Sequence, residues 1–317
     1  MSEIAILGAG AWGTALAIQA ARAGNDVVLW AHSGADALAE SRESSRLEGH
    51  RLPERVRVTG DISLLTGTVI AAVPTQSLRA ALEQLPDVPE LVICAKGIET
   101  GTLRLPLEIA AEVQPNAVAA VLTGPNFAHE IASGQPAAAV VAGQDQAMRD
   151  AVISRLATPT FRLYGSDDPL GAQLGGAAKN VIAIAAGAVT GAGLGENARA
   201  ALITRGLAEL SRMTAALGGR AETVMGLSGL GDLLLTCTGP ASRNFSLGFA
   251  LGRGETLASI LARRRSVTEG IATAPALVAR AKGVEMPICE AVAALLAGRT
   301  TLREAIVTLL ARPRRDE

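Results

Sequence analysis

Short apolar runs alternate with helical patterns over the first half of the chain. Five of these runs are four to six residues long, rich in branched side chains and without polar alternation, as buried parallel strands are: Ile4–Leu7, Val27–Trp30, Val69–Val73, Leu91–Cys94 and Ala117–Leu122. Helical patterns lie between several of them, for example at Thr14–Ala23 and Gln76–Gln84. This alternation predicts βαβ units and a doubly wound sheet, which further runs at Ala137–Val141 and Phe161–Tyr164 would extend.

The pattern changes after about Pro169. Long Ala/Leu-rich segments with helical periodicity follow, separated by Gly, Ser and Thr, and no strand-like run interrupts them: Ala177–Val189, Ala198–Leu217, Ala272–Lys282 and Leu302–Leu310. The sequence therefore predicts an α/β N-terminal domain with a Rossmann-like sheet over residues 1–168, and an all-helical domain over residues 169–317.

Composition excludes several classes of protein. The 317 residues carry 29 Lys and Arg against 30 Asp and Glu, so the net charge of −1 indicates no nucleic-acid surface. Aromatic residues make up only 2%, which disfavours stacking platforms for single-stranded nucleic acid. The three cysteines and three histidines are scattered without disulfide or metal-ligand spacing, so we expect a reducing cytoplasm and no metal site: Cys94, Cys237, Cys289, His32, His50 and His129.

The apolar segment Ile4–Ala21 resembles a signal or membrane segment. Ser2 and Glu3 precede it in place of basic residues, and glycines interrupt its first half. We therefore expect it to be part of a cytosolic fold.

The first strand leads directly into a glycine-rich loop. Gly8, Gly10 and Gly13 form G-x-G-x-x-G between a strand and a helical pattern, which is the context that makes this motif typical of a dinucleotide site. Gly8 would allow the tight turn, Gly10 the approach of a pyrophosphate, and Gly13 close packing of helix on strand. The helix N-terminus would then supply N–H groups to the phosphates.

The end of the second strand bears on the choice of cofactor. An NAD site usually has Asp or Glu there to bind the ribose hydroxyls, whereas this chain has Ala31, His32 and Ser33 after Trp30. NADP is therefore permitted. His32 would donate to the 2′-phosphate or lie over the adenine, or it is a histidine of a surface loop.

Four further sites have residues suited to chemistry. Lys96 follows a strand at its carboxyl end, where parallel sheets bind ligands, unless it is simply solvated. Lys179 opens a helix among glycines and branched residues, so we expect it to be partly desolvated. Asp232 follows a glycine turn, either as a functional carboxylate or as a helix cap. Arg243, in Ser242-Arg243-Asn244, has the donor fork of a phosphate clamp, although the same residues also suit the start of a surface helix.

Taken in order, these motifs resemble the bacterial NAD(P)-dependent glycerol-3-phosphate dehydrogenases over essentially the whole chain. The stretches that carry the resemblance are the glycine loop and these six: 95–97, 123–128, 173–181, 197–206, 229–232 and 242–244. The resemblance implies reversible reduction of dihydroxyacetone phosphate to sn-glycerol 3-phosphate with NADP(H) or NAD(H), at the entry to phospholipid synthesis. It also implies a small-molecule substrate, a cytoplasmic location and a homodimer.

The resemblance also implies roles for individual residues. Lys179 corresponds to the family's proton acceptor. Substrate contacts correspond to Lys96, Gly124, Asn126, Lys179, Asp232, Ser242, Arg243 and Asn244. Cofactor contacts correspond to the glycine loop with Ala11 and to Trp12, His32, Lys96, Ala128, Arg243, Val267 and Glu269. Two positions depart from the family pattern, since Ala11 replaces a frequent Ser and Asn126 replaces a usual Ser or Thr.

These assignments give a coherent chemical scheme. Hydride delivery to the C2 carbonyl creates an alkoxide, which the Lys179 ammonium would stabilise and protonate. We expect burial, Lys96 and Arg243 to lower the pKa of Lys179, and Asp232 to orient its amine. Arg243 would hold the substrate phosphate, in a cleft between the two domains.

Two alternatives remain at this point. One is another β-hydroxyacid-type dehydrogenase, similar to 6-phosphogluconate dehydrogenase, which the Ser242–Asn244 cluster disfavours. The other is an NADPH-binding sensor without catalysis, which the presence of Lys179 disfavours.

Overall fold

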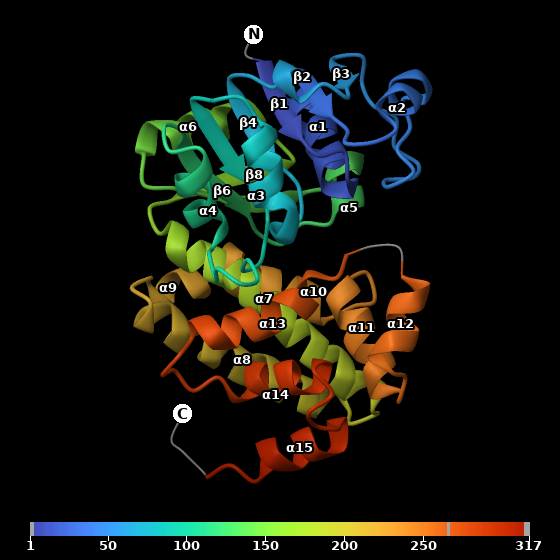
Figure 1. The fold of residues 1–317 in the computed structure, drawn as a ribbon, viewed down its shortest axis with the longest axis vertical. Helices are drawn as coiled ribbons and strands as arrows, with labels where there is room; N and C mark the ends of the chain where they lie inside the picture. Colours follow the sequence, from blue (N-terminus) through green and yellow to red (C-terminus); the bar gives the residue numbers. More distant parts are fainter. Residues whose placement is uncertain (1–2, 265–266, 314–317) are drawn as a thin grey trace. The chain divides into compact units, whose positions relative to one another are not determined.

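The computed structural model describes residues 3–264 and 267–313, and the chain divides into two compact units. Unit 1 comprises Met1–Lys96 and Arg104–Gln173, and unit 2 comprises Gly97–Leu103 and Leu174–Glu317. Figure 1 traces the chain from the strands of unit 1 to the helices of unit 2.

Unit 1 is built on an eight-stranded sheet with the order β3-β2-β1-β4-β5-β6-β7-β8. The strands are β1 (Glu3–Leu7), β2 (Asp26–Trp30), β3 (Val56–Thr59), β4 (Thr68–Ala71), β5 (Glu90–Ile93), β6 (Val118–Thr123), β7 (Ala137–Ala142) and β8 (Phe161–Ser166). The chain leaves β1 towards β2 and β3 on one side and returns to β4 on the other, which is the doubly wound arrangement. The predicted fold class is confirmed, and all seven predicted runs are strands.

Two features of the sheet were not foreseen. Strand β3 is short and has the exposed Arg57 at its second position, so it lacks the continuous apolar run by which the other strands were found. Strand β7 pairs antiparallel with β6, while the other neighbouring pairs are parallel. An Ala/Val run such as β7 indicates burial, but it does not encode strand direction.

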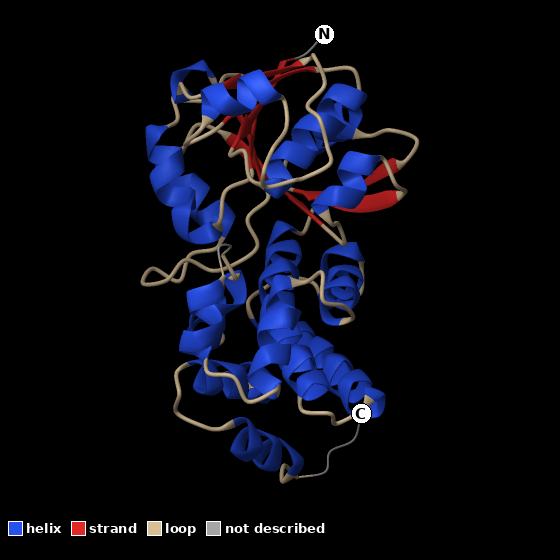
Figure 2. Cartoon of the chain, turned by 90° about the vertical axis from the view of Figure 1, so that its right-hand side faces the viewer, coloured by secondary structure: helices blue, strands red, loops and turns tan. Residues whose placement is uncertain are grey.

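Helices lie on both sides of the strands (Figure 2). They are α1 (Ala11–Arg22), α2 (Ala35–Ser41), α3 (Thr75–Gln84), α4 (Pro106–Val113), α5 (Ala128–Ser133) and α6 (Gln146–Leu156), with a 3-10 turn at Ile62–Leu64. Helix α1 packs against α5 and α6, and its apolar side chains share one core with Ile4, Ile6 and Leu29 of the sheet. The N-terminal apolar segment is therefore the first strand and helix of this core.

The described residues of unit 2 form helices joined by loops, and no strand is present among them. Its helices are α7 (Pro169–Gly191, which belongs to this unit from Leu174), α8 (Glu196–Ala216), α9 (Ala221–Val224), the π-helical turn η2 (Leu227–Gly231), α10 (Asp232–Cys237), α11 (Arg243–Gly252), α12 (Leu257–Arg263), α13 (Glu269–Arg280), α14 (Pro287–Leu296) and α15 (Leu302–Leu310). The four predicted helices correspond to α7, α8, α13 and α15. Helix α7 begins earlier than expected, at Pro169. The glycines in its first turns do not end the helix, because Gly175 packs closely against the backbone of Ser228.

Helix α7 is buried along most of its length. Within the described residues it is the one helix long and apolar enough to cross a membrane by length and composition, but 94% of that stretch is buried inside the protein. Helix α11 crosses α7 with its backbone in contact, since a Cβ atom on Gly248 would lie 1.9 Å from the carbonyl oxygen of Ile184. Burial and this contact identify α7 as a core helix.

Candidate active site

The glycine loop of unit 1 has the geometry that the motif predicts. Gly8 has φ +113°, a conformation that other residues rarely adopt, and a Cβ on Gly13 would lie 1.8 Å from the carbonyl oxygen of Gly8. The turn from β1 into α1 therefore requires glycine at both positions. A Cβ on Gly10 would meet no atom within 4 Å, so this position borders open space.

A cavity of about 920 Å³ lies beside this loop, within unit 1. Its wall runs from Gly8 and Gly10 to the residues after β2 and to the segment around Ser44. Helix α1 has no side-chain cap at Gly10, so the N–H groups of its first turn are available to a ligand, as at phosphate-binding helix termini. The volume, the open Gly10 and the uncapped helix together fit a dinucleotide.

The end of β2 borders the same cavity. Trp30 donates from its indole nitrogen to the carbonyl oxygen of Gly60 at 3.1 Å, and the His32 ring stands edge-on to it with 5.8 Å between ring centroids. His32 is exposed and lines the cavity together with Ser33. The prediction that His32 contacts the adenosine end of the cofactor therefore has a compatible geometry.

Ala11 and Trp12 occupy the first two positions of α1, and both are half-buried. Burial raises the pKa of the nearby Cys94 thiol to about 12, against a smaller lowering effect of Trp12, so this thiol stays protonated at neutral pH.

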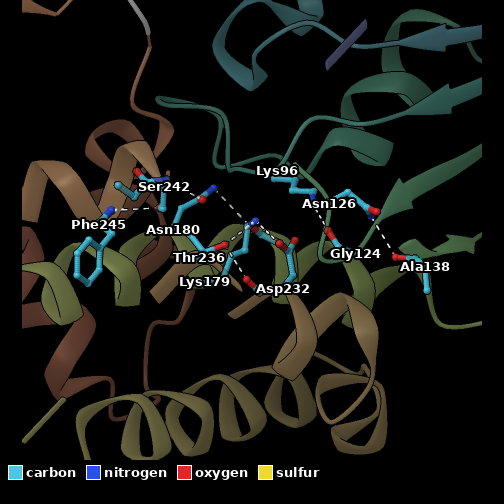
Figure 3. Close-up of polar contacts among 12 residues, drawn as sticks. Lys96, Gly124, Asn126, Ala138, Lys179, Asn180, Asp232, Thr236, Ser242 and Phe245 are labelled. Carbon is cyan, nitrogen blue, oxygen red and sulfur yellow. Dashed lines mark hydrogen bonds and ion pairs between the residues drawn. The ribbon is translucent and has the colours of Figure 1, made fainter. Parts of the chain in front are cut away.

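A second group of predicted residues lies at the carboxyl ends of β5 and β6 (Figure 3). Lys96 Nζ donates to the carbonyl oxygen of Gly124 at 2.9 Å, so the structure brings these two predicted substrate contacts together. Asn126 donates from Nδ2 to the carbonyl oxygen of Ala138 at 3.2 Å, and its buried Oδ1 has no hydrogen-bond partner among the described residues. Ala128 is the first residue of α5 and is half-buried.

Lys179 lies well inside α7. The expectation that it opens a helix is wrong, because α7 already begins at Pro169. One turn earlier on the same helix, a Cβ on Gly175 would lie 2.5 Å from the carbonyl oxygen of Ser228. This close approach places η2, and with it the start of α10, against the side of α7 that carries Lys179.

The amine of Lys179 is held by two side chains of α10 (Figure 3). Its Nζ forms an ion pair with Asp232 and donates to Thr236 Oγ1 at 3.0 Å. Thr236 in turn donates to the carbonyl oxygen of Asp232 at 2.6 Å, one helical turn back. Lys179 and Asp232 are 8% and 1% exposed, and a buried ammonium of this kind is tolerated only with a carboxylate partner.

A chain of buried amides connects α7 to α11 and α13. Asn244 donates from Nδ2 to Asn180 Oδ1 at 2.8 Å and accepts the N–H of Gly270 at 3.0 Å. Ser242 caps α11 by accepting the N–H of Phe245 at 3.2 Å. The structure thus gives Ser242 and Asn244 well-defined positioning roles, and their predicted contacts with substrate stay predictions.

Arg243 is the first residue of α11, and its side chain is exposed. Its guanidinium makes no hydrogen bond or ion pair within the described chain. Arg264 lies beside it and donates to the Arg243 carbonyl at 2.8 Å and to Ser246 Oγ at 3.0 Å. The predicted cofactor contacts Val267 and Glu269 follow in the same region, Val267 exposed and Glu269 at the start of α13.

Sequence reasoning missed Thr236, Asn180 and Arg264. Thr236 carries a recognisable signal, since it stands four residues after Asp232 on a helix and therefore on the same face. Asn180 directly follows Lys179, but nothing in the sequence pairs it with Asn244, 64 residues away. Arg264 belongs to a run of three arginines without a distinguishing spacing.

The two parts of the chain supply complementary chemistry. Unit 1 has a cavity with helix dipole and backbone donors for phosphates, which suits a dinucleotide. Unit 2 has a buried amine that can move a proton and an exposed arginine for an anionic group. In residues 3–264 and 267–313 no group of three or more His, Cys, Asp or Glu side chains is placed to hold a metal ion.

Comparisons with known proteins identify the family of the chain. A family model described as NAD-dependent glycerol-3-phosphate dehydrogenase N-terminus matches residues 3–149, and the corresponding C-terminus model matches residues 168–307. The chain is 58% identical to glycerol-3-phosphate dehydrogenase [NAD(P)+] of Acidiphilium cryptum, covering 99% of this chain and 98% of that protein. It is 51% identical to the protein of the same name from Bradyrhizobium sp., with 99% and 98% covered.

A solved structure leads to the same family. The crystal structure of glycerol-3-phosphate dehydrogenase from Coxiella burnetii superimposes with a TM-score of 0.92 at 36% identity, over 98% of this chain and 99% of that one. The fold, the two family models and the full-length relatives confirm the resemblance drawn from the motifs. The chain belongs to the NAD-dependent glycerol-3-phosphate dehydrogenase family.

Proposed function

We propose that this protein interconverts dihydroxyacetone phosphate and sn-glycerol 3-phosphate with NAD(P)(H), and that Lys179 moves the proton. The observation that carries the proposal is the buried cluster of Lys179, Asp232 and Thr236, in a chain of this family whose N-terminal half holds a dinucleotide cavity. When bound, the reduced nicotinamide supplies the hydride that reduces the C2 carbonyl.

The residues of unit 1 bind and orient the cofactor. The uncapped first turn of α1 and the backbone around Gly10 receive the pyrophosphate. His32 and Ser33 border the adenosine end. These groups position the cofactor and take no part in proton movement.

Lys179 acts on the substrate oxygen. As C2 gains the hydride its oxygen becomes an alkoxide, and the ammonium at Lys179 Nζ stabilises that charge and then donates a proton to it. In the reverse direction the neutral amine accepts the proton from the alcohol. Asp232 and Thr236 hold the Lys179 nitrogen in place in both directions of the reaction, which fixes the distance and direction of the proton transfer.

Arg243 binds the phosphate of the substrate. Its guanidinium is exposed and uncommitted to any described residue, and it stands in the first turn of α11, whose N-terminal dipole also favours an anion. Binding energy from the phosphate, which does not react, fixes the carbon that does. Lys96 with Gly124, and Asn126, complete the proposed set of substrate contacts.

The arrangement of domains, assembly and location are part of the same proposal. Residues 1–168 serve the cofactor, residues 169–317 serve the substrate, and the chain acts as a cytoplasmic homodimer. Exposed apolar side chains on α15, Val307 at 59% and Leu310 at 81%, support association with a second copy. Light scattering of the purified protein tests the dimer.

One assay tests the central proposal. Purified protein is mixed with NADPH or NADH and dihydroxyacetone phosphate, and loss of reduced nicotinamide is followed by absorbance. We expect rapid oxidation with dihydroxyacetone phosphate, and a KM for it that rises in Arg243→Ala. Cofactor binding without oxidation would favour a sensor, and reduction of NADP+ by 6-phosphogluconate in preference to glycerol 3-phosphate would favour the related dehydrogenase.

A further inference from the structure

One arginine on the wall of the cofactor cavity has no role in the scheme so far. Arg46 lines the same cavity in unit 1 as His32 and Ser33, which follow β2. In a Rossmann-like site this is the region that meets the ribose 2′ position, where an acidic residue selects NAD and a nearby arginine accommodates the 2′-phosphate of NADP.

The surrounding arginines are engaged elsewhere. Arg42 donates to the carbonyl oxygens of Val56 at 2.8 Å, Leu52 and Pro53. The remaining three form ion pairs with carboxylates: Arg51 with Glu43 at 3.8 Å, Arg55 with Asp26 at 3.0 Å and Arg57 with Glu3 at 3.8 Å. Each of these side chains therefore already has a partner within unit 1.

Arg46 differs from these four arginines in its partners and in its position at the cavity. Its guanidinium has neither a hydrogen bond nor an ion pair with any residue in the described ranges, and of the five arginines between 42 and 57 it is the one that borders the cavity. Its backbone is nevertheless fixed, because its N–H donates to the buried Ser44 Oγ at 3.2 Å and Leu47 beside it is buried. A fixed backbone with an uncommitted guanidinium at a ligand cavity is the arrangement that an anion-binding arginine needs.

The charges around Arg46 also favour an anionic ligand. Glu43 also borders the cavity, but its carboxylate is paired with Arg51. The residues that follow β2 add His32 and Ser33 as donors and no carboxylate. Ser44 and Ser45, which directly precede Arg46 in the chain, also line the cavity, so the group that would meet a ribose 2′-phosphate is an arginine accompanied by hydroxyls.

We infer that Arg46 binds the 2′-phosphate of NADP(H) and makes this protein prefer NADP(H) over NAD(H). The inference rests on the proposed function only in taking a nicotinamide dinucleotide as the ligand of the cavity. A bidentate contact from a guanidinium to a phosphate oxygen pair gives both the affinity and the discrimination.

The test compares binding of NADPH and NADH by fluorescence titration, for the full-length protein and for Arg46→Gln. We expect the Kd for NADPH to rise by about tenfold or more in the variant and the Kd for NADH to change less than about twofold, since a charge-assisted contact is lost for one cofactor only. Arg46→Lys, which keeps the charge and loses the fork, should fall between them. Arg57→Gln, which removes the same charge outside the cavity wall, is the matched control and should leave the ratio unchanged.

The outcomes separate this inference from the proposed function. Equal weakening of both cofactors in Arg46→Gln, an unchanged NADPH Kd, or a wild type that binds NADH at least as tightly as NADPH would each overturn it. Because binding needs no turnover, a protein that fails to reduce dihydroxyacetone phosphate but loses NADPH selectively in Arg46→Gln would contradict the proposed function and support the inference. Since Arg46 has no partner to lose, the variant should keep the melting temperature of the wild type.

Discussion

The glycine loop of unit 1 and the amine cluster of unit 2 are built in opposite ways. The loop offers mainly backbone, since its glycines leave room for a ligand and the helix that follows has no side-chain cap. The amine cluster offers side chains, each buried and held by another: Lys179 by Asp232 and Thr236, and Asn180 by Asn244. The loop therefore depends on the absence of side chains, and the amine cluster depends on contacts between buried side chains.

This difference predicts opposite responses to substitution. Adding a methyl group to the loop should disturb its fold or its ligand binding, because the loop depends on space that a side chain would fill. Removing a side chain from the amine cluster should destabilise it, because the buried polar or charged partner that remains has no hydrogen bond or ion pair.

The largest effect should follow removal of the amine. Lys179→Ala should lower kcat by about 100- to 10,000-fold, the usual contribution of a positioned acid or base, while the Kd for NADPH stays nearly unchanged. Steady-state kinetics and fluorescence titration measure the two quantities. Lys179→Met in combination with Asp232→Asn removes both buried charges and keeps the volume, so that loss of activity can be separated from loss of folding.

The chain offers a close control for this variant. Lys282→Ala removes the same side chain from an exposed position after α13, and it should leave kcat unchanged. Appreciable turnover in Lys179→Ala would assign the proton to another group and remove the contrast between the two regions.

The next largest effect should come from one methyl group in the loop. In Gly13→Ala the new Cβ would lie 1.8 Å from the carbonyl oxygen of Gly8, so the turn must move, at a cost of about 1–3 kcal/mol in the free energy of unfolding. We also expect NADPH to bind at least about tenfold more weakly, because the turn positions the phosphate site. Thermal unfolding and titration measure these effects.

Gly10→Ala separates the two consequences. No atom lies within 4 Å of a Cβ at this position, so the melting temperature should not change, while the Cβ occupies space beside the cavity and weakens NADPH binding. If Gly10→Ala bound NADPH as well as the wild type does, the loop would not be the phosphate site.

The same contrast explains what could be predicted from the sequence. The loop is a contiguous motif between a strand and a helix, so Gly8, Gly10 and Gly13 are recognisable in one short stretch. The amine cluster joins segments that are 53 residues apart in the case of Lys179 and Asp232, and this pairing was expected only through the resemblance to a family. The partner Thr236 and the contact of Asn180 with Asn244 were missed, because no contiguous motif connects them. Strand β3 was missed for a local reason, since Arg57 interrupts its apolar run.

A third effect, of intermediate size, tests whether a buried side chain elsewhere in unit 2 also depends on its hydrogen-bond partners. Glu209 on α8 is 1% exposed and accepts the N–H groups of Ile288 at 2.7 Å and Cys289 at 3.2 Å. These are in the first turn of α14, which has no side-chain cap of its own. Glu209→Gln replaces one accepting oxygen by an NH₂ group, so we expect a loss of about 1–3 kcal/mol in the free energy of unfolding.

The effect should also depend on pH. Burial raises the pKa of Glu209 above its usual range, against the opposing influence of the two N–H donors. The folded protein therefore binds this proton more readily than the unfolded chain, and stability falls as the pH rises from about 4.5 through the raised pKa. The stability advantage of wild type over Glu209→Gln should be greatest at low pH and shrink across that window in denaturant titrations. An advantage that grew with pH would show that the carboxylate form is the favoured one.

The smallest effect should come from Arg264, which contacts Arg243, the residue proposed to bind the substrate phosphate. Its guanidinium ties the Arg243 carbonyl to Ser246 Oγ and to Thr268 Oγ1 at 3.3 Å, and so braces the first turn of α11. Burial, then the charges of Arg243 and Arg263, lower the pKa of Arg264, as expected for a cation placed among cations. Arg264→Gln loosens this turn and removes one positive charge, and we expect the KM for dihydroxyacetone phosphate to rise about two- to fivefold, equivalent to about 1 kcal/mol or less, with kcat almost unchanged.

Two further variants separate bracing from charge at this position. Arg264→Lys keeps the positive charge but cannot reach three acceptors in a fixed fork, so a KM near that of Arg264→Gln means that geometry dominates. Arg263→Gln removes the same charge from an exposed neighbour that pairs with Glu255, and it should leave the KM unchanged. A fall in kcat without a rise in KM would group Arg264 with the amine cluster. A rise in KM alone would mean that the proposed phosphate site of unit 2, unlike the loop of unit 1, depends on side chains that support the one proposed to contact the ligand.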